Sequence, residues 1–180
     1  MKPVRVIDNF LPEEEYREIH SMMTSDSFPW HFKSTIVTPN ETPSPGFFCN
    51  VLYDSNCPTN MPVFERLIPI YNRLQIYALL RIKANLNWRL PEPYVQDWHN
   101  DIVDMTESAI EHWSVAIYYV NTNNGYTQYM ENGITKRIES IENRVVVFPA
   151  NTAHRGISQT DTQNRIVINF NYQEGDGFWA

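Results

Sequence analysis

The sequence contains few cysteines, no segment rich in lysine and arginine, and no apolar stretch of the length needed to cross a bilayer. Cys49 and Cys57 are the only two cysteines among 180 residues, which predicts free thiols rather than a disulfide framework. The net charge of −7 and the lack of a basic run disfavour a nucleic-acid partner, because phosphate backbones are bound by clustered cations. The N-terminal MKPVRVIDNF lacks the charged region and long apolar core of a signal peptide, so we expect a cytoplasmic protein without a membrane partner.

The length and composition favour a globular fold. A chain of 180 residues can bury a sizeable core, so we expect residues 1–180 to form a single domain. Hydrophobic residues make up 42% of the chain and aromatic residues 13%, which is typical of a folded protein. The sequence contains no internal repeat and no low-complexity tract.

Two helices are predicted in the first half of the chain. A proline followed by three glutamates is typical of a helix start, and the first helix is expected over residues 13–24. Residues 25–60 hold many of the prolines and predict an irregular segment with short strands. A second helix is expected after Asn60, since apolar residues recur at helical spacing as far as Ala78, and Pro69 predicts a kink or a break in it.

Strands dominate the rest of the sequence, because the hydrophobic period changes to two from about residue 80. The expected strands are VRVIDNFL at 4–11, LLRIKANLN at 79–87, YVQDWHND at 94–101, WSVAIYYVN at 113–121, TQYM and ITKRIE on either side of the turn ENG, NRVVVFP at 143–149, HRGIS at 154–158 and RIVINFNY at 165–172. Helices followed by at least seven short strands predict an α+β, mainly β fold. We expect a sandwich or jelly roll with N-terminal helices packed on one sheet.

A histidine and an aspartate lie two residues apart at the end of the segment 94–101. In a strand, His99 and Asp101 would point to the same side, which suits either two solvated polar residues or two ligands of a metal ion. His154 begins another predicted strand and is a candidate third ligand. Two histidines and one carboxylate form the facial triad that holds Fe(II), and the set contains no thiolate that would favour structural zinc. Asp104 is a rival carboxylate, but its odd spacing from His99 turns it to the other face.

Arg165 is a candidate anion-binding residue. A hairpin is predicted between it and His154, which would place the two residues on neighbouring strands about 5 Å apart. By strand parity, the apolar residues at even positions of 166–172 face the helices, and Arg165 faces a cavity. A buried arginine requires an anion, and a small dicarboxylate that also chelates the metal would satisfy it. Alternatively, Arg165 lies at the rim and pairs with Asp161 or Glu142.

Together these motifs resemble those of the 2-oxoglutarate- and Fe(II)-dependent dioxygenases, in particular their prolyl-hydroxylase-like branch. The resemblance rests on H-x-D, a later histidine and an arginine in that order, on AIYYVN and NRVVVF, and on the opening VIDNFLPEEEYREI. It covers most of the chain and is densest from 81 to 172. It implies a double-stranded β-helix fold and an enzyme that uses Fe(II), 2-oxoglutarate as a small-molecule cosubstrate and O₂, with ascorbate as a candidate additional requirement.

The resemblance also implies roles for individual residues. It assigns the catalytic metal ion to the three ligands His99, Asp101 and His154. It assigns the distal carboxylate of 2-oxoglutarate to Arg165, with a hydrogen bond from Tyr119, and it places Asn85 near the keto-acid end. The assignment of Asn85 is loose because the loop from 88 to 95 differs in length from the family pattern. NNGYT also replaces the usual pair of glycines after the tyrosine strand, and both tyrosines of IYYVN could be ordinary strand aromatics.

The function implied by the resemblance is hydroxylation of a peptide-borne or free amino acid. Asp101 occupies the iron position that a halide would need, so hydroxylation is expected rather than halogenation. Two other classes stay open: a non-catalytic jelly-roll structural or binding module, and a cupin-like metalloenzyme that does not use 2-oxoglutarate. Neither alternative requires a clamp for a dicarboxylate, so Arg165 and Tyr119 discriminate against both.

Overall fold

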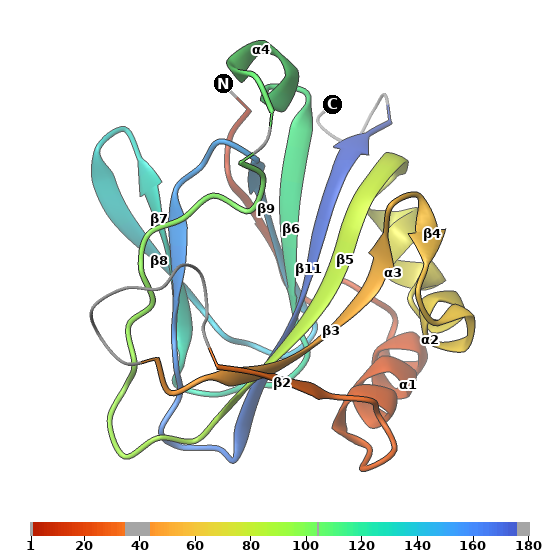
Figure 1. Cartoon of the computed structure of the whole chain (residues 1–180), viewed down its shortest axis with the longest axis vertical. Coiled ribbons are helices and arrows are strands. Elements are labelled where there is room, and N and C mark those ends of the chain that lie inside the picture. The colour runs from red at the N-terminus through yellow and green to blue at the C-terminus, as the bar shows by residue number, and fades with distance from the viewer. Residues whose placement is uncertain (1, 35–43, 104, 176–180) are drawn as a thin grey trace.

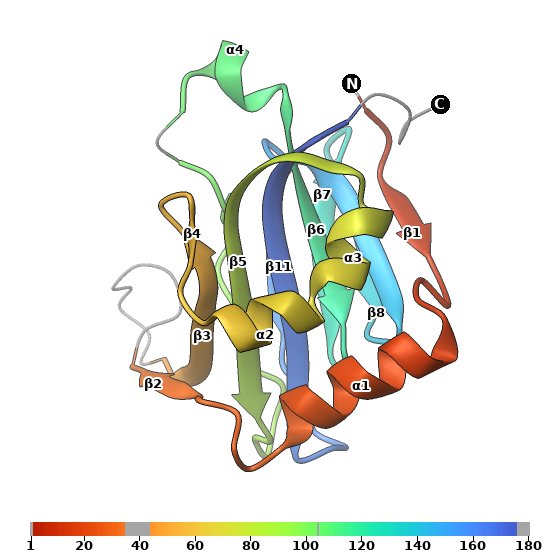
Figure 2. The ribbon, with the colours of Figure 1, turned by 90° about the vertical axis from the view of Figure 1, so that its right-hand side faces the viewer.

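Two antiparallel sheets face each other, and three helices cover the outer face of the larger sheet (Figures 1 and 2). This computed structural model describes residues 2–34, 44–103 and 105–175. The predicted fold, mainly β with helices on one sheet, is confirmed. In the part of the chain that the structure describes, no helix is long and apolar enough to cross a membrane.

The larger sheet contains eight strands and the smaller sheet three. In spatial order the larger sheet consists of β1 (Arg5–Ile7), β9 (Arg144–Pro149), β6 (Trp113–Tyr119), β11 (Asn164–Glu174), β5 (Ile76–Trp88), β3 (Phe47–Asp54) and β2 (His31–Lys33), with β4 (Cys57–Pro58) paired to β3. The smaller sheet consists of β10 (His154–Ile157), β7 (Tyr126–Glu131) and β8 (Ile134–Glu139). The predicted hairpin around ENG is the β7–β8 connection.

The helices differ in how closely they follow the sequence prediction. The first, α1 (Glu13–Thr24), has the predicted bounds. The second predicted helix is divided into α2 (Met61–Arg66) and α3 (Ile68–Arg73), because Pro69 lies in the first turn of α3, where the ring is tolerated. The prediction that the helix continues to Ala78 is wrong, since Gln75 has a φ of 51° and β5 begins next to it. A short α4 (Glu107–Ile110) precedes β6.

The core has two layers, one on each side of the larger sheet. Strand β11 lies at the centre of this sheet between β5 and β6. Its residues Ile166, Ile168, Phe170 and Tyr172 pack with apolar residues of the helices, such as Ile19 and Met23 of α1, as predicted from strand parity. The opposite face of the sheet points toward the smaller sheet, and there Val167 packs with Tyr129 of β7. Arg165 and Asn169, which alternate with the residues that face the helices, point into the space between the two sheets.

Two of the predicted strands are shorter or less regular than expected. The strand predicted over 4–11 is limited to β1, because Asn9 has a φ of 50° and ends the extended chain. The prediction that 94–101 is a strand is wrong, since only isolated bridges join this segment to β10. The side chains of Gln96 and Ser158 form hydrogen bonds where backbone groups would form them in a regular ladder. The segment therefore follows β10 without regular strand pairing.

The predicted hairpin between His154 and Arg165 is also wrong. His154 is on β10, which pairs with β7 in the smaller sheet, and His154 lies opposite Tyr129. Arg165 is on β11 in the larger sheet and lies opposite Asn87 of β5. The connection from 158 to 163 crosses from one sheet to the other instead of turning within one. His154 and Arg165 consequently approach the same interior space from two facing walls.

Candidate active site

Two histidines lie directly opposite each other at the edge of the smaller sheet. His99 of the irregular segment and His154 of β10 form a bridge in which each backbone N–H donates to the other residue's carbonyl, at 3.0 Å in both cases. Opposite residues of an antiparallel pair project to the same side. The imidazole centroids are therefore only 4.6 Å apart.

Backbone carbonyls determine the tautomer of both imidazoles. His99 Nδ1 lies 2.9 Å from the carbonyl oxygen of Asp97, and His154 Nδ1 lies 3.1 Å from that of Thr152. A carbonyl can only accept a hydrogen bond, so Nδ1 carries the proton in each ring. The lone pair of each neutral ring then lies on Nε2, as metal-binding histidines require. His154 Nε2 is buried and has no hydrogen-bond partner among the described residues, as expected of a nitrogen that would bind a metal ion.

Asp101 completes the cluster with one carboxylate oxygen. Its Oδ1 lies 3.8 Å from Nε2 of both His99 and His154, and its Oδ2 accepts a hydrogen bond from Asn169 Nδ2 at 3.2 Å. Burial raises the pKa of Asp101, but the two imidazoles, the Arg81 guanidinium and the Asn169 hydrogen bond outweigh it and place the pKa below its usual value. The carboxylate is therefore ionised.

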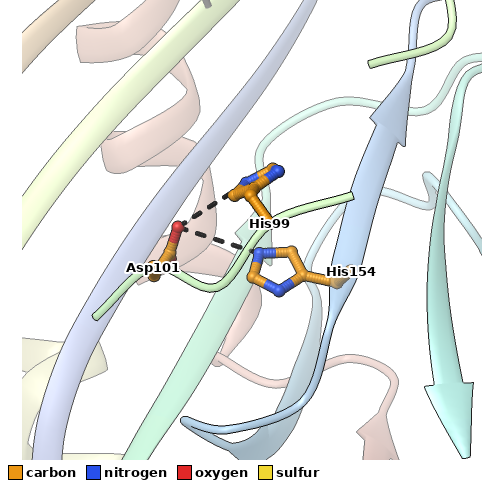
Figure 3. Close-up of side chains that lie close together, drawn as sticks. All are labelled: His99, Asp101 and His154. Atoms are coloured by element: carbon orange, nitrogen blue, oxygen red, sulfur yellow. Dashed lines mark ion pairs between the residues drawn. The ribbon is translucent and has the colours of Figure 1, made fainter. Parts of the chain in front are cut away.

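The three side chains point toward one position, as Figure 3 shows. Their candidate ligand atoms all lie within 4.8 Å of one another. Burial lowers the pKa of His154, so this imidazole is neutral and available as a ligand at neutral pH. Two imidazoles and a carboxylate on one side of a common point are suited to Fe(II) with open coordination positions. Asp104, the rival carboxylate, lies outside the described residues.

A cavity of about 240 Å³ extends from this cluster between the two sheets. In the part of the chain that the structure describes, its walls are made of strand residues and residues of the segment 94–101. Arg165 lines the same cavity and is 3% exposed. The cavity thus contains a cluster of potential metal ligands and a buried guanidinium.

Among the described residues, Arg165 is held by hydroxyl groups and not by a carboxylate. Its Nε donates to Ser140 Oγ at 2.9 Å, and its Nη2 donates to Thr127 Oγ1 at 3.2 Å. These bonds use two of the five N–H donors of the guanidinium. The alternative of a rim residue paired with Asp161 is wrong, because that carboxylate accepts instead from the Asn124 backbone N–H. No salt bridge joins Arg165 to Glu142 either in the described structure, and the side chain is buried.

The two tyrosines of β6 have different environments. Tyr118 faces the helices, and its hydroxyl donates to Asn143 Oδ1 at 3.1 Å, which is the ordinary structural role left open by the sequence. Tyr119 faces the space between the sheets, and its hydroxyl donates to Thr127 Oγ1 at 2.8 Å. The Arg165 guanidinium carbon lies 5.7 Å from the centroid of the Tyr119 ring. Tyr119 is thereby connected to Arg165 through Thr127.

The other predicted residue, Asn85, lines the cavity from β5. Several residues that line the cavity do not belong to any of the sequence motifs: Arg81, Lys83, Thr127 and Asn169. Alternation along β5 and β11 places most of these on the same face as a predicted residue, and parity is the signal that could have identified them. Gly125 is a further residue that the motifs do not identify. A Cβ atom at this position would lie 2.8 Å from Arg165 Cδ, so only glycine leaves room for the arginine.

Asn169 gives the first testable prediction. Replacing it with alanine removes the hydrogen bond that orients the Asp101 carboxylate. Loss of such a partner typically lowers metal affinity about 10- to 100-fold, and we expect a decrease in this range for Mn(II). Titration with Mn(II) followed by electron paramagnetic resonance measures it. Asn171→Ala, a buried asparagine on the same strand that does not line the cavity, is the control; equal affinity of the two variants would contradict the role.

Comparison with solved structures identifies the fold. An oxidoreductase of the 2OG-Fe(II) oxygenase family from Burkholderia pseudomallei superposes with a TM-score of 0.64 at 10% identity, covering 97% of this chain and 86% of the other. A prolyl hydroxylase from Trichoplax adhaerens, in complex with a peptide of a hypoxia-inducible factor, gives a TM-score of 0.64 at 12% identity, with coverages of 96% and 84%. The chain has the double-stranded β-helix fold of the 2-oxoglutarate- and Fe(II)-dependent oxygenases.

The predicted resemblance to these oxygenases is confirmed at the level of the fold. The same fold occurs in SnoK, a non-heme α-ketoglutarate-dependent carbocyclase from nogalamycin biosynthesis, with a TM-score of 0.66 at 12% identity and coverages of 97% and 81%. A comparison with protein-family models finds no match, and neither does one with the sequences of curated proteins. A prolyl hydroxylase and a carbocyclase share this fold, so the fold alone does not determine the reaction.

Proposed function

We propose that the protein is an Fe(II)- and 2-oxoglutarate-dependent dioxygenase that hydroxylates a peptide-borne or free amino acid, with residues 1–180 as the catalytic domain. The observation that carries the proposal is a single cavity lined both by a triad of potential metal ligands and by a buried arginine that has no carboxylate partner in the described structure. A metal site alone would not require that arginine. A dicarboxylate that reaches from the metal to the guanidinium accounts for both.

The residues singled out from the sequence each have a role in this proposal. Fe(II) is held by His99, Asp101 and His154. Arg165 binds the distal carboxylate of 2-oxoglutarate through the donors that the two hydroxyl groups leave free. Tyr119 supports this end of the cosubstrate, and Asn85 lies near the keto-acid end, which it approaches from β5.

The chain's contribution to the reaction is binding, orientation and exclusion of water. Bound Fe(II), 2-oxoglutarate and O₂ supply the oxidising chemistry. The Asp97 and Thr152 carbonyls hold the Nδ1 protons of the two imidazoles and so keep both Nε2 atoms available. Asn169 keeps the Asp101 carboxylate directed at the ion. The burial of Arg165 excludes water from the carboxylate that it binds, which strengthens that interaction.

Hydroxylation of an amino acid is supported by two observations. Asp101 supplies a carboxylate to the triad and would occupy the coordination position that a halide would need. The solved structures with this fold include the prolyl hydroxylase bound to a peptide. The carbocyclase shows that the fold also accommodates other outcomes, which a mass measurement distinguishes.

The proposal is tested by turnover of 2-oxoglutarate. The protein is incubated with Fe(II), ascorbate and 2-oxoglutarate, and succinate is measured first without and then with proline-containing peptides and free amino acids. Succinate release and a mass increase of about 16, one oxygen atom, are expected for the substrate. A metal-loaded protein that never converts 2-oxoglutarate would favour a structural jelly-roll module. Turnover with oxidation of alkylated nucleic acid alone would replace the substrate class.

Tyr119→Phe tests the support given to the cosubstrate. The substitution removes one hydroxyl that donates to Thr127 and keeps the ring. We expect the affinity for 2-oxoglutarate to fall by about 1 kcal/mol, which corresponds to a factor of about five. Calorimetric titration of the Mn(II)-loaded variant measures the change. Tyr118→Phe is the matched control, since its hydroxyl contacts Asn143 on the other face of the sheet; the same loss in both variants would contradict the role.

A further inference from the structure

The cavity contains two cations that the proposed function does not use. Arg81, Lys83, Asn85 and Asn87 alternate along β5, so all four side chains lie on the cavity face of the strand. Arg81 and Lys83 are both half-buried. They lie near the proposed metal end, because Arg81 Nη2 donates to the backbone carbonyl of Asp101 at 3.2 Å and Lys83 lies opposite Asn169, the hydrogen-bond partner of Asp101.

Neither cation has a carboxylate within ion-pair distance among residues 2–34, 44–103 and 105–175. Lys83 Nζ lies 5.1 Å from the centroid of the Phe47 ring, which also lines the cavity. Burial lowers the pKa of Lys83, and Arg81 and Lys33 contribute in the same direction, against Cys49 and Asp101. Two neighbouring cations without a paired anion are costly to keep in a partly dry cavity. This cost is offset if an anion binds there.

The charge balance of the cavity supports the same conclusion. The ionised side chains that line it are the three cations Arg81, Lys83 and Arg165 and the single carboxylate Asp101. The charges of Fe(II) and of the 2-oxoglutarate dianion cancel each other. With both bound, the cavity retains two positive charges in a protein whose net charge is −7. One carboxylate of 2-oxoglutarate pairs with Arg165, and the other carboxylate together with Asp101 offsets the two charges of Fe(II), so the surplus lies at Arg81 and Lys83.

We propose that Lys83 and Arg81 bind a carboxylate of the primary substrate, which is therefore a small organic acid, such as an amino acid with a free or side-chain carboxylate. The inference rests on the proposed function, because the charge balance includes its metal and cosubstrate. It narrows the substrate class to molecules that carry a negative charge close to the oxidised carbon. A peptide segment without an acidic group would leave both cations unpaired.

A carboxylate fits this site better than a phosphate. Phosphate sites commonly use the N-terminus of a helix or a nest of backbone N–H groups. Every described residue that lines this cavity lies on a strand or on the segment 94–101, and α1, α2 and α3 cover the opposite face of the larger sheet. The volume of about 240 Å³ is below the range of roughly 300–1,000 Å³ that is usual for ligand pockets, and it is shared with the metal and the cosubstrate. The space that remains favours a compact anionic group.

The test uses the protein loaded with Mn(II) and saturated with 2-oxoglutarate. Binding of 2-oxoglutarate is first verified by calorimetry. The relaxation that Mn(II) induces in the methyl protons of propionate is then measured by nuclear magnetic resonance, with methyl phosphate, propionamide and propylammonium as comparison probes. This readout detects weak binding near the metal and needs no turnover. We expect strong relaxation of propionate and at least about fivefold less for propionamide, which has a similar shape and no charge.

Variants at position 83 test whether Lys83 is responsible for the binding of propionate. Lys83→Met should lower the relaxation of propionate at least about fivefold, and Lys83→Arg, which retains the charge, should preserve most of it. Lys136→Met is the control, because Lys136 is on β8, pairs with Glu131 and does not line the cavity. Melting temperatures verify that the variants fold.

Each outcome is decisive. Equal relaxation of propionate and propionamide, or no difference between wild type and Lys83→Met, would overturn the inference while 2-oxoglutarate still binds. Stronger relaxation of methyl phosphate than of propionate, lost in Lys83→Met, would overturn the assignment of a carboxylate. If 2-oxoglutarate fails to bind the Mn(II)-loaded protein, the proposed function fails first, and the inference fails with it.

Discussion

His99→Ala is expected to abolish stoichiometric binding of Fe(II) or Mn(II) and, with it, any turnover of 2-oxoglutarate. The substitution removes one of the three side chains that bind the metal. The two ligands that remain are too few to hold the ion tightly. Loss of a partner outside the coordination sphere already lowers metal affinity about 10- to 100-fold, so loss of a ligand should exceed about 100-fold. The imidazole of His99 is half-buried, and its replacement should leave the fold intact.

Metal titration of the variant beside wild type measures this loss. His20→Ala is the matched control, because His20 lies on α1, on the far side of the larger sheet, where its ring contacts Tyr16. Wild type and the control should bind one ion with equal affinity. Stoichiometric binding by His99→Ala as well would eliminate the assigned triad.

Arg165→Leu is expected to weaken the binding of 2-oxoglutarate far more than the binding of metal. Truncation of one partner of a buried, charge-assisted pair costs about 2–5 kcal/mol, or roughly 30- to 5,000-fold in the dissociation constant. Leucine fills part of the volume of arginine without its donors, so the two sheets should remain packed. Mn(II) affinity should stay within about threefold of wild type, since Arg165 is not a ligand.

Calorimetric titration of the Mn(II)-loaded proteins separates the two effects. Arg137→Leu is the control, because Arg137 is exposed on β8 and pairs with Glu139. Arg165→Lys gives a second measure: it keeps the charge but loses the planar fork, so its affinity should fall between those of wild type and the leucine variant. An unchanged dissociation constant for 2-oxoglutarate in Arg165→Leu would refute the assigned role.

The elements with a strong local signal were predictable from the sequence. The bounds of α1 follow from a proline and glutamates before an amphipathic run, and those residues act locally. The parity of β11 was also predictable, because alternation of apolar and polar residues reflects a sheet with one face on helices and one on a cavity. Strand parity alone is therefore sufficient to predict that Arg165 points into the interior.

The pairing of strands was not predictable from local pattern. The stretch between His154 and Arg165 has the length and turn residues of a hairpin, yet the chain crosses between sheets there. Hydrogen bonds to β7 on one side and to β5 and β6 on the other determine this path, and all these partners are distant in sequence. The same reason explains why the contact of Asn169 with Asp101 could not be read from the sequence.

The irregular pairing of segment 94–101 with β10 gives the metal a second effect. The two histidines face each other across a single bridge, next to positions where the side chains of Gln96 and Ser158 replace ladder bonds. An ion shared by both histidines acts as a cross-link that closes a long loop of the chain, and its binding free energy adds to the free energy of folding. The metal-loaded protein should therefore unfold at a higher temperature than the metal-free protein. A chelator should lower the unfolding temperature and abolish the activity at the same time.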